Sequence, residues 1–371
     1  MKITAVRAIP LAIPIRSGSP SSAWAGALAK QVLVRIDTDA GLTGWGEAFA
    51  YGAPLAVCNV VDETLAPLLL GEDATRIEAH LDRLQRVLMV WGRRGLGMFA
   101  LAGIDLALWD LAGKALGVPV WRLLGGRAQP RVRAYASMLR YATSSEVGHV
   151  ASALAAAGYT AIKLHQTDVE SVAVARDAVG WGVELMLDTN CPWAVEDAIT
   201  MARRLEPAGL RWLEEPVWPP EDYRGLARVR AATSIPIASG ENEATAFGFR
   251  AAFDAGAMDI AQPSVTKVGG LSEMRKVAVL AASVNVTVVP HAFYYGPGLA
   301  ASVHFALATP GVPYVEFPGA ALDAPLLAEP VRCLDGYVQI ADRPGLGADP
   351  DPAVLERYRY QLGAGRAFDL T

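Results

Sequence analysis

The chain has 371 residues, which is too long for one ordinary domain and fits two domains or one large barrel with an addition. Hydrophobic residues make up 52% and charged residues 19%, a composition that excludes a disordered or fibrous chain. The 33 basic and 38 acidic residues give a net charge of −5, so there is no basic surplus to bind a nucleic-acid backbone.

The cysteine content and the longest uncharged stretch indicate in which cellular compartment the protein is expected. The three cysteines, Cys58, Cys191 and Cys333, are few and far apart, which suits a reducing cytosol better than a disulfide framework or a zinc site. The first residues lack a basic region followed by a long apolar run, so they do not resemble a targeting segment. Residues 277–315 carry no Asp, Glu, Lys or Arg, but prolines and glycines interrupt them, which favours buried elements over a membrane span. We therefore expect a cytoplasmic protein without a membrane partner.

The first part of the chain is predicted to form antiparallel strands followed by helices. Residues 2–10 and 30–38 are rich in β-forming residues, and residues 39–41 (DAG) are typical of a hairpin turn. Apolar spacing then predicts helical segments over about 60–90 and 98–116.

From about residue 130 the pattern changes to short apolar runs, each followed by an amphipathic stretch. Four consecutive runs start 23 to 26 residues apart, a spacing that indicates parallel βα units. Eight such runs predict a closed (β/α)8 barrel: 132–136, 161–165, 184–188, 210–214, 236–240, 258–262, 286–290 and 313–317. The tail after about residue 325 contains a β-like piece, 336–340, outside the eight-strand count, so we expect it to pack on the N-terminal part.

Polar residues fall at the carboxyl ends of these predicted strands, which face the active-site mouth of a barrel. The second run ends in Lys163 and His165, whose side chains share one face by strand alternation. By the same alternation Glu215 points away from Glu214 and is expected to be structural. The polar positions at the later strand ends are Asp188 with Asn190, Glu214, Glu241, His291 and Glu316.

Three of these carboxylates predict a metal site. Asp188, Glu214 and Glu241 are spaced by 26 and 27 residues on successive strand ends and would converge on one point. Like charges buried together need a cation, and oxygen-only ligands with open positions suit a hard ion, so we expect Mg²⁺. The alternative is that each acid caps the helix after its strand, but three acids in register favour the metal site.

Proton-transfer groups flank this predicted site in strand order, with Lys163 and His165 on one side and His291 on the other. A cation between two such groups is the arrangement needed to abstract a proton next to a carboxylate. The metal and Lys163 would hold the carboxylate and stabilise the enediolate charge, while a side chain on one face takes the proton.

At these residues the sequence resembles the enolase superfamily, in its mandelate racemase/muconate lactonizing enzyme branch, over essentially the whole chain. Residues 100–114 (ALAGIDLALWDLAGK) and 123–125 (LLG) resemble the helix before the barrel. The segments that resemble the metal-ligand strands and the sixth strand are 185–190 (LMLDTN), 213–216 (LEEP), 240–242 (GEN), 258–263 (MDIAQP) and 267–270 (KVGG). A Lys or His base acting with Mg²⁺ is an established pattern of this superfamily.

The resemblance implies an α/β fold. Residues 126–325 would form the (β/α)8 TIM-like barrel, and residues 1–125 an N-terminal α+β capping domain that closes over the barrel mouth. The C-terminal segment, residues 326–371, would complete the capping domain. A small-molecule carboxylate substrate and a homo-oligomer are also expected.

The resemblance implies roles for individual residues as well. Asp188, Glu214 and Glu241 would be the Mg²⁺ ligands. The loop from Arg16 to Ala29, with Trp24, and the loop from Ala48 to Pro54, with Tyr51, would supply substrate specificity, unless they are ordinary surface loops. Asn190, Ser264 and Lys267 are further candidates for substrate contacts, although Lys267 could instead stabilise the sixth strand.

The sequence departs from the family pattern at two positions. The second strand of the family usually carries Lys-x-Lys with the second lysine as base, and His165 stands at that position. Racemases of this branch carry an Asp on the sixth strand that orients the seventh-strand histidine, and the matching position is Ser264. Without that carboxylate, His291 should be less basic and a readier proton donor.

These observations favour a Mg²⁺-dependent dehydratase of an acid sugar, in which His165 is the base and His291 the acid, or the reverse for a substrate of opposite configuration. Glu316 would hydrogen-bond an oxyanion, or be a structural carboxylate. The alternatives are a racemase, epimerase or cycloisomerase that uses the same enediolate, and a non-catalytic barrel that binds a carboxylate.

Overall fold

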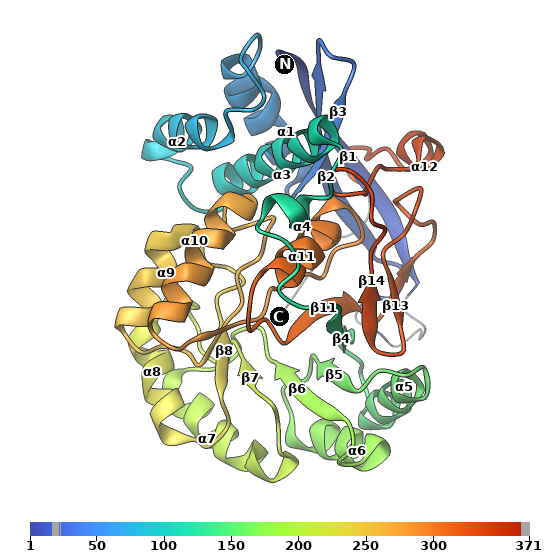
Figure 1. Ribbon diagram of the computed structural model, residues 1–371. Helices are drawn as coiled ribbons and strands as arrows, with labels where there is room; N and C mark the ends of the chain where they lie inside the picture. The colour runs from blue at the N-terminus through green and yellow to red at the C-terminus, as the bar shows by residue number, and fades with distance from the viewer. Residues whose placement is uncertain (17–21, 23, 365–371) are drawn as a thin grey trace.

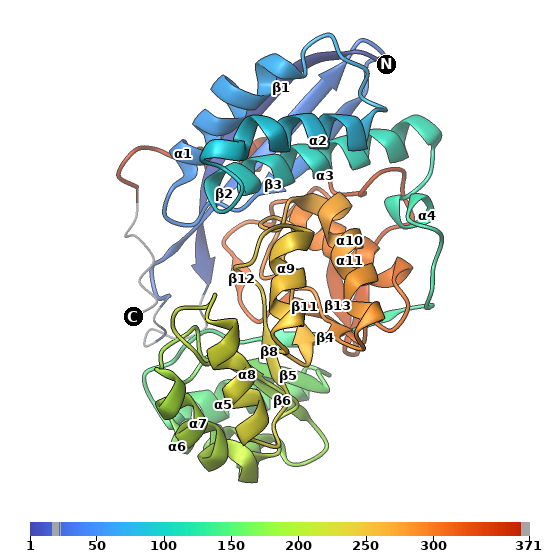
Figure 2. The same cartoon turned by 90° about the vertical axis from the view of Figure 1, so that its left-hand side faces the viewer.

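The computed structural model describes residues 1–16, 22 and 24–364. The N-terminal third forms a sheet covered by helices at the top of Figures 1 and 2, and a ring of strands surrounded by helices lies below it. The predicted α/β architecture, a capping domain on a (β/α)8 barrel, is confirmed.

The capping sheet is antiparallel and contains β1 (Ile3–Arg16), β2 (Leu28–Thr38) and β3 (Thr43–Ala48). The predicted turn joins β2 to β3, whereas β1 is longer than predicted and β3 was not predicted. The strand β3 contains two glycines, which are rare in strands, so its residues did not predict a strand. The structure nevertheless requires these glycines. A Cβ on Gly46 would lie 1.9 Å from the carbonyl oxygen of Gly103, so only glycine lets this strand contact the helix beneath it.

The helical pattern predicted over 60–90 forms several short helical elements rather than one continuous helix. The chain forms α1 (Pro54–Asn59), a π-helical turn (Val60–Leu65), a 3-10 turn (Ala66–Leu68) and then α2 (Ile77–Val87), followed by a 3-10 turn (Leu88–Val90). Pro67 and Gly71 fall between the two α-helices and interrupt the helical backbone.

The predicted helix over 98–116 is confirmed as α3 (Leu96–Leu116). By length and composition α3 is apolar enough to cross a membrane, but 83% of its most apolar window is buried inside the protein. It is therefore a core helix, and Figure 2 shows it on the side of the capping domain that faces the barrel, above α10.

All eight predicted barrel strands are present, most of them shorter than predicted. They are β4 (Val132–Ser137), β5 (Ala161–Leu164), β6 (Glu184–Asp188), β7 (Leu213–Glu214), β8 (Ile237–Ser239), β9 (Ile260–Ala261), β10 (Thr287–Val288) and β11 (Tyr314–Pro318). Consecutive strands from β4 to β10 pair in parallel, and β11 pairs with β4, which brings the last strand beside the first. A separate buried cluster takes one residue from each strand or its end and fills the interior: Tyr135, Ala161, Met186, Trp212, Ala238, Ile260, Val289 and Tyr314.

Helices follow the strands and cover the outside of the ring (Figure 1). They are α5 (Ser144–Ala156), α6 (Val169–Val179), α7 (Val195–Leu205) with a 3-10 turn (Glu206–Ala208), α8 (Tyr223–Ala232), α9 (Thr245–Asp254), α10 (Gly270–Ser283) and α11 (Pro297–Ala308). The short helix α4 (Val120–Leu123) precedes the barrel.

The C-terminal tail contacts both domains. β12 (Ala321–Leu322) pairs with β1 of the cap, whereas β14 (Tyr337–Gln339), which forms a hairpin with β13 (Arg332–Leu334), pairs with β4 of the barrel. The helix α12 (Pro352–Arg357) follows this hairpin in the chain. The division of the chain at residues 125 and 325 stays a prediction.

Two buried aspartates on α3 fasten it to its surroundings. The Asp105 carboxylate accepts hydrogen bonds from the hydroxyl (2.6 Å) and the backbone N–H (3.1 Å) of Ser272, at the N-terminus of α10. Gly270 permits this contact, because a Cβ there would lie 2.0 Å from an Asp105 oxygen and its φ is +87°. Two of the motifs used for the family resemblance are therefore in direct contact.

The second aspartate, Asp110, allows the contribution of these buried contacts to stability to be tested. Its carboxylate accepts from Trp45 N (2.9 Å) and Leu346 N (2.7 Å) and pairs with Lys114 (2.8 Å), so it joins α3 to the cap and the tail. Because all three contacts are buried or nearly so, Asp110→Ala should lower the free energy of unfolding by about 3 kcal/mol, measured by chemical denaturation. Asp82→Ala, which removes only a surface ion pair, should leave the midpoint unchanged. An Asp110→Ala midpoint equal to that of the wild type would contradict this account.

Candidate active site

A cavity lies between the capping domain and the carboxyl ends of the barrel strands. The capping domain contributes Trp24 and Tyr51. The barrel contributes Met138, Leu139, Arg140, His165, Asp188, Asn190, Glu241, Lys267, His291, Phe293 and Glu316. Nine of the twelve residues selected from the sequence therefore line one cavity. The other three are Lys163, Glu214 and Ser264, which are buried.

Asp188, Glu214 and Glu241 converge as predicted. One ligand oxygen from each lies within 4.8 Å of the others. They stand at the end of β6, at the end of β7 and two residues after β8, so the parallel register of the strands sets their separation. This all-oxygen donor set fits a hard divalent cation such as Mg²⁺.

The charges around this point also fit a cation. Five buried carboxylates gather here, on Asp188, Glu214, Glu215, Glu241 and Glu316. The basic side chains described beside them are Lys163, Lys267, Arg140 and the two histidines His165 and His291. Burial raises the pKa of Glu214 well above its usual value, Lys163 opposes this rise, and the neighbouring Asp188 and Glu316 add to it. A divalent cation would relieve this repulsion.

Lys163 lies at the centre of the carboxylates and has no exposed surface. Its Nζ lies 2.8 Å from Glu214, 2.9 Å from Glu316 and 3.3 Å from Asp188. Burial disfavours the charged ammonium, but these carboxylates outweigh that effect and raise the pKa of Lys163 well above its usual value. Lys163 is therefore a fixed positive charge at neutral pH rather than a base.

His165 is the more open of the two site histidines. Its Nε2 lies 3.1 Å from Asp188, and its side chain is 17% exposed, against 8% for His291. The contact orients the ring, and Arg140 holds the backbone there through a 3.0 Å hydrogen bond to the His165 carbonyl. Burial opposes ionisation of Asp188, but Lys163 and His165 outweigh it and lower the pKa of this carboxyl.

His291 faces the carboxylates from the other flank. Its Nε2 lies 3.2 Å from Glu241 and 3.9 Å from Glu316, so it does have carboxylate neighbours, although none is contributed by position 264. Burial lowers the pKa of His291 despite these two acids. Its Nδ1 lies 3.2 Å from the hydroxyl of Tyr294, which in turn contacts Ser264. Ser264 therefore contacts the catalytic candidate His291 through Tyr294 and does not line the cavity.

Glu316 is an ionised carboxylate in this arrangement. Burial opposes ionisation, but Lys163, His291 and the Ala292 N–H at 2.7 Å together lower its pKa to about 2. An ionised carboxylate has no proton to donate to an oxyanion, so the geometry favours a role for Glu316 in holding Lys163.

Asn190 and Lys267 both contact predicted metal ligands. Asn190 takes a left-handed φ of 55°, and its side-chain amide donates to Asp188 at 3.1 Å. The Lys267 ammonium lies 2.9 Å from Glu241 and 4.3 Å from the centre of the Phe49 ring. Of the two readings of Lys267, the geometry favours the one in which it lines the site.

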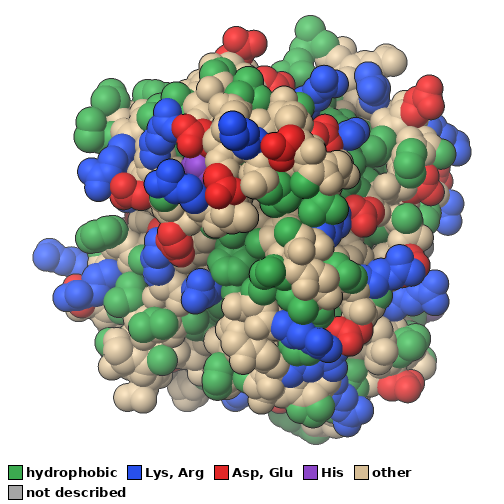
Figure 3. Space-filling view, turned by 45° about the horizontal axis from the view of Figure 1, so that its top comes forward, with side chains coloured by type: hydrophobic (Ala, Val, Ile, Leu, Met, Phe, Trp, Pro, Cys, Tyr) green, Lys and Arg blue, Asp and Glu red, His purple; other side chains and the backbone are tan. Residues whose placement is uncertain are grey.

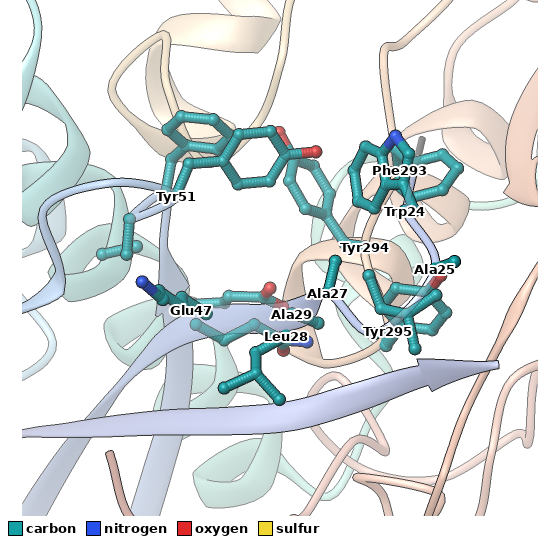
Figure 4. A pocket seen from close by; sticks show the side chains of 17 residues that line it. Trp24, Ala25, Ala27, Leu28, Ala29, Glu47, Tyr51, Phe293, Tyr294 and Tyr295 are labelled. Atoms are coloured by element: carbon teal, nitrogen blue, oxygen red, sulfur yellow. The ribbon is translucent and has the colours of Figure 1, made fainter. Parts of the chain in front are cut away.

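Aromatic side chains cover the cavity on the capping side. Trp24 packs edge-on against Tyr51, with ring centres 6.1 Å apart, and lies 5.6 Å from Phe293. An adjoining cavity of about 220 Å³ extends beneath the same aromatics toward Glu47 (Figure 4). Residues 17–21 and 23 of the predicted specificity loop lie outside the described residues.

Sequence reasoning missed three residues of this site. Glu215 does not point away, because the strand ends at Glu214 and Glu215 takes a φ of 45°, which breaks the alternation. Its carboxylate accepts from the side-chain amide of Asn242, the neighbour of Glu241, at 3.2 Å. Burial, then Glu241 and Asp188, raise the pKa of Glu215. Arg140 follows the first barrel strand and could have been found by extending the strand-end argument to that strand, whereas no sequence signal identifies Tyr294.

Comparisons with known proteins agree with this site and fold. Residues 9–125 match the family model described as the mandelate racemase/muconate lactonizing enzyme N-terminal domain, and residues 146–354 match the one described as enolase C-terminal domain-like. The chain is 36% identical to the D-galactarolactone cycloisomerase of Agrobacterium fabrum, covering 97% of this chain and 99% of that protein. It is 33% identical to the arabinonate dehydratase of Saccharolobus solfataricus, covering 88% and 90%.

Solved structures give the same result. The 3,6-anhydro-D-galactonate cycloisomerase of Zobellia galactanivorans superposes with a TM-score of 0.88 at 31% identity, covering 97% of this chain and 100% of that one. A member of the enolase superfamily from Polaromonas sp. JS666 superposes with a TM-score of 0.87 at 32% identity, covering 98% and 99%. With both domains matched and the carboxylates in register, the chain belongs to the mandelate racemase/muconate lactonizing enzyme branch of the enolase superfamily.

Proposed function

We propose that this enzyme uses Mg²⁺ to abstract the α-proton of an acid sugar and that the reaction leads to dehydration. The single observation that carries the proposal is the position of Lys163, a fixed cation held by three carboxylates. Two of these carboxylates also face the cavity histidines, since Asp188 contacts His165 and Glu316 lies 3.9 Å from His291. The names of relatives support the substrate class, since they include arabinonate dehydratase and D-galactonate dehydratase.

The residues divide the reaction between them. Lys163 binds the substrate carboxylate and offsets the negative charge that develops on it as the α-proton leaves. His165 takes the α-proton, because it is oriented by Asp188 and is the more exposed histidine. His291 gives a proton from Nε2 to the departing β-hydroxyl, which leaves as water, and the resulting enol becomes a 2-keto-3-deoxy acid.

The proposed cation would be held by Asp188, Glu214 and Glu241. When bound it supplies Lewis-acid stabilisation of the enediolate charge. Lys267 and Asn190 keep two of these carboxylates in place through hydrogen bonds of 2.9 and 3.1 Å. The capping aromatics Trp24 and Tyr51 exclude water and contact the distal part of the substrate.

Cycloisomerisation is the second candidate. It begins with the same proton abstraction, and a cycloisomerase is among the most similar relatives, at 36% identity. The non-catalytic alternative has no such support, since these relatives are named as enzymes. Racemisation is less favoured, because it needs a competent base on both faces and His291 contacts a hydroxyl pair where racemases place a carboxylate.

The proposal includes a small-molecule partner, a cytoplasmic location and a homo-oligomer. Figure 3 shows acidic and basic side chains interspersed over the face it draws, which fits the absence of a nucleic-acid partner. Met89, Val90 and Trp91 are exposed by 69%, 84% and 53%, which fits a contact between copies of the chain.

The metal is tested by chelation and titration. Removal of divalent ions should abolish turnover of acid sugars, read as keto-acid formation, and Mg²⁺ should restore it. Glu241→Gln should weaken Mg²⁺ binding by about tenfold or more in calorimetric titration, because one charged ligand is lost. The surface variant Glu196→Gln should bind Mg²⁺ like the wild type. Full activity in excess chelator would exclude the proposed chemistry.

Lys163→Met should reduce kcat by about 100-fold or more, because the fixed positive charge at the carboxylate is lost. Lys276→Met, which removes an ammonium on the outer surface of α10, is the matched control and should retain full activity. Circular dichroism should show both variants folded. A folded Lys163→Met enzyme with normal kcat would show that the assignment is wrong.

The two histidines are separated by exchange in D2O, followed by NMR of the substrate. His291→Asn should still exchange the α-proton while product formation is lost, because the base is intact and the acid is missing. His165→Asn should lose both, and His149→Asn, on the exposed face of α5, should lose neither. The reverse pattern would exchange the roles. Interconversion of stereoisomers by the wild type without elimination would promote the racemase alternative.

A further inference from the structure

A pair of hydroxyl groups lies behind His291, on the side of the ring away from the carboxylates. The Tyr294 hydroxyl lies 3.2 Å from His291 Nδ1 and also hydrogen-bonds the Ser264 hydroxyl. Counted over whole residues, the exposed fractions of His291, Tyr294 and Ser264 are 6%, 4% and 0%. The three side chains therefore form a continuous, buried chain of hydrogen bonds.

The register of the barrel explains how this chain arises. Ser264 and His291 are bridge partners immediately after β9 and β10, so position 264 lies directly beside the histidine. A longer acidic side chain there would reach the ring itself. Serine is too short to do so, and the hydroxyl of Tyr294, three residues after His291, occupies the space between them. Figure 4 shows Tyr294 between the aromatics of the adjoining cavity.

The neighbours of the ring set its orientation. His291 Nε2 faces Glu241 at 3.2 Å, so Nδ1 is the ring nitrogen that faces Tyr294. The Tyr294 hydroxyl can donate to Nδ1 or accept from it, and Ser264 can take either role toward Tyr294. The contacts thus run from Ser264 through Tyr294 to His291.

We propose that Tyr294, itself oriented by Ser264, is the positioning residue for His291, an inference that rests on the proposed function. A hydroxyl can donate to Nδ1 of the neutral ring or accept from Nδ1–H of the charged ring, turning its own hydrogen to Ser264. To act as the acid the ring carries both protons, and Tyr294 accepts from Nδ1–H; after Nε2 gives its proton to the departing hydroxyl, the neutral ring keeps the Nδ1 proton and the same hydrogen bond, so its orientation does not change. A carboxylate would orient the ring too, but it would add a negative charge to a site that already holds five acids.

Kinetics and NMR of matched variants test this role. Tyr294→Phe should lower kcat by about 10- to 100-fold while KM stays within about twofold, because the hydroxyl acts on His291 and not on bound substrate. Tyr314→Phe is the control, since it also removes one buried tyrosine hydroxyl, with a 2.7 Å hydrogen bond to Glu184. It should leave kcat and KM unchanged. Ser264→Asp introduced into Tyr294→Phe should restore part of kcat, because the carboxylate reaches Nδ1 directly.

NMR of protein labelled with ¹⁵N-histidine reads the contact without turnover, and the chain has only five histidines to assign. The Nδ1 signal of His291, identified by its loss in His291→Asn, should move in Tyr294→Phe and stay in place in Tyr314→Phe. An unmoved Nδ1 signal, or equal kinetic losses in the two tyrosine variants, would overturn the proposal. A wild type that turns over no acid sugar would instead refute the proposed function, while the NMR result would still report whether Tyr294 holds the ring.

Discussion

Buried negative charge at the barrel mouth is the constraint on which the rest of the site depends. Five carboxylates lie together here, and the ammonium of Lys163 contacts three of them without any exposure to solvent. Such an arrangement is costly unless the charges are compensated. Lys163 and Lys267 supply part of this compensation, and the proposed divalent cation would supply the rest. An enediolate needs the same positive charge, so the same electrostatics would serve the fold and the proposed chemistry.

The scaffold holds this charge in place through parallel register and a clamped cap. Neighbouring strands place the predicted metal ligands Asp188 and Glu214 directly beside each other. The helix α3 then ties the capping domain to α10 through Asp105, and Gly270 at the start of α10 allows that close approach. Glycines in β3 let the capping sheet approach α3 closely as well. The aromatic side chains over the cavity are thereby held above the strand ends that carry the charges.

The sequence predicts the elements that recur at a regular spacing along the chain. The eight barrel strands and the strand-end residues follow from a regular period, and the metal ligands follow from their matching spacing. Prediction fails where one residue changes the local backbone. Glycines concealed β3, Pro67 and Gly71 divided the helix predicted over 60–90, and the left-handed φ of Glu215 broke the alternation used to place it. The contact of Tyr294 with His291 forms in a loop after β10. A loop has no repeating hydrophobic pattern, so the sequence does not predict this contact.

The central claim is that the carboxylates of Asp188, Glu214 and Glu241 hold a divalent cation and leave Lys163 free to bind substrate. Anomalous scattering from crystals of the enzyme soaked in Mn²⁺ tests it directly, because Mn²⁺ takes the same oxygen ligands as Mg²⁺ and is visible at its absorption edge. The account predicts one strong anomalous peak at the meeting point of these three carboxylates. A peak elsewhere, or none at this point at saturating Mn²⁺, would contradict it.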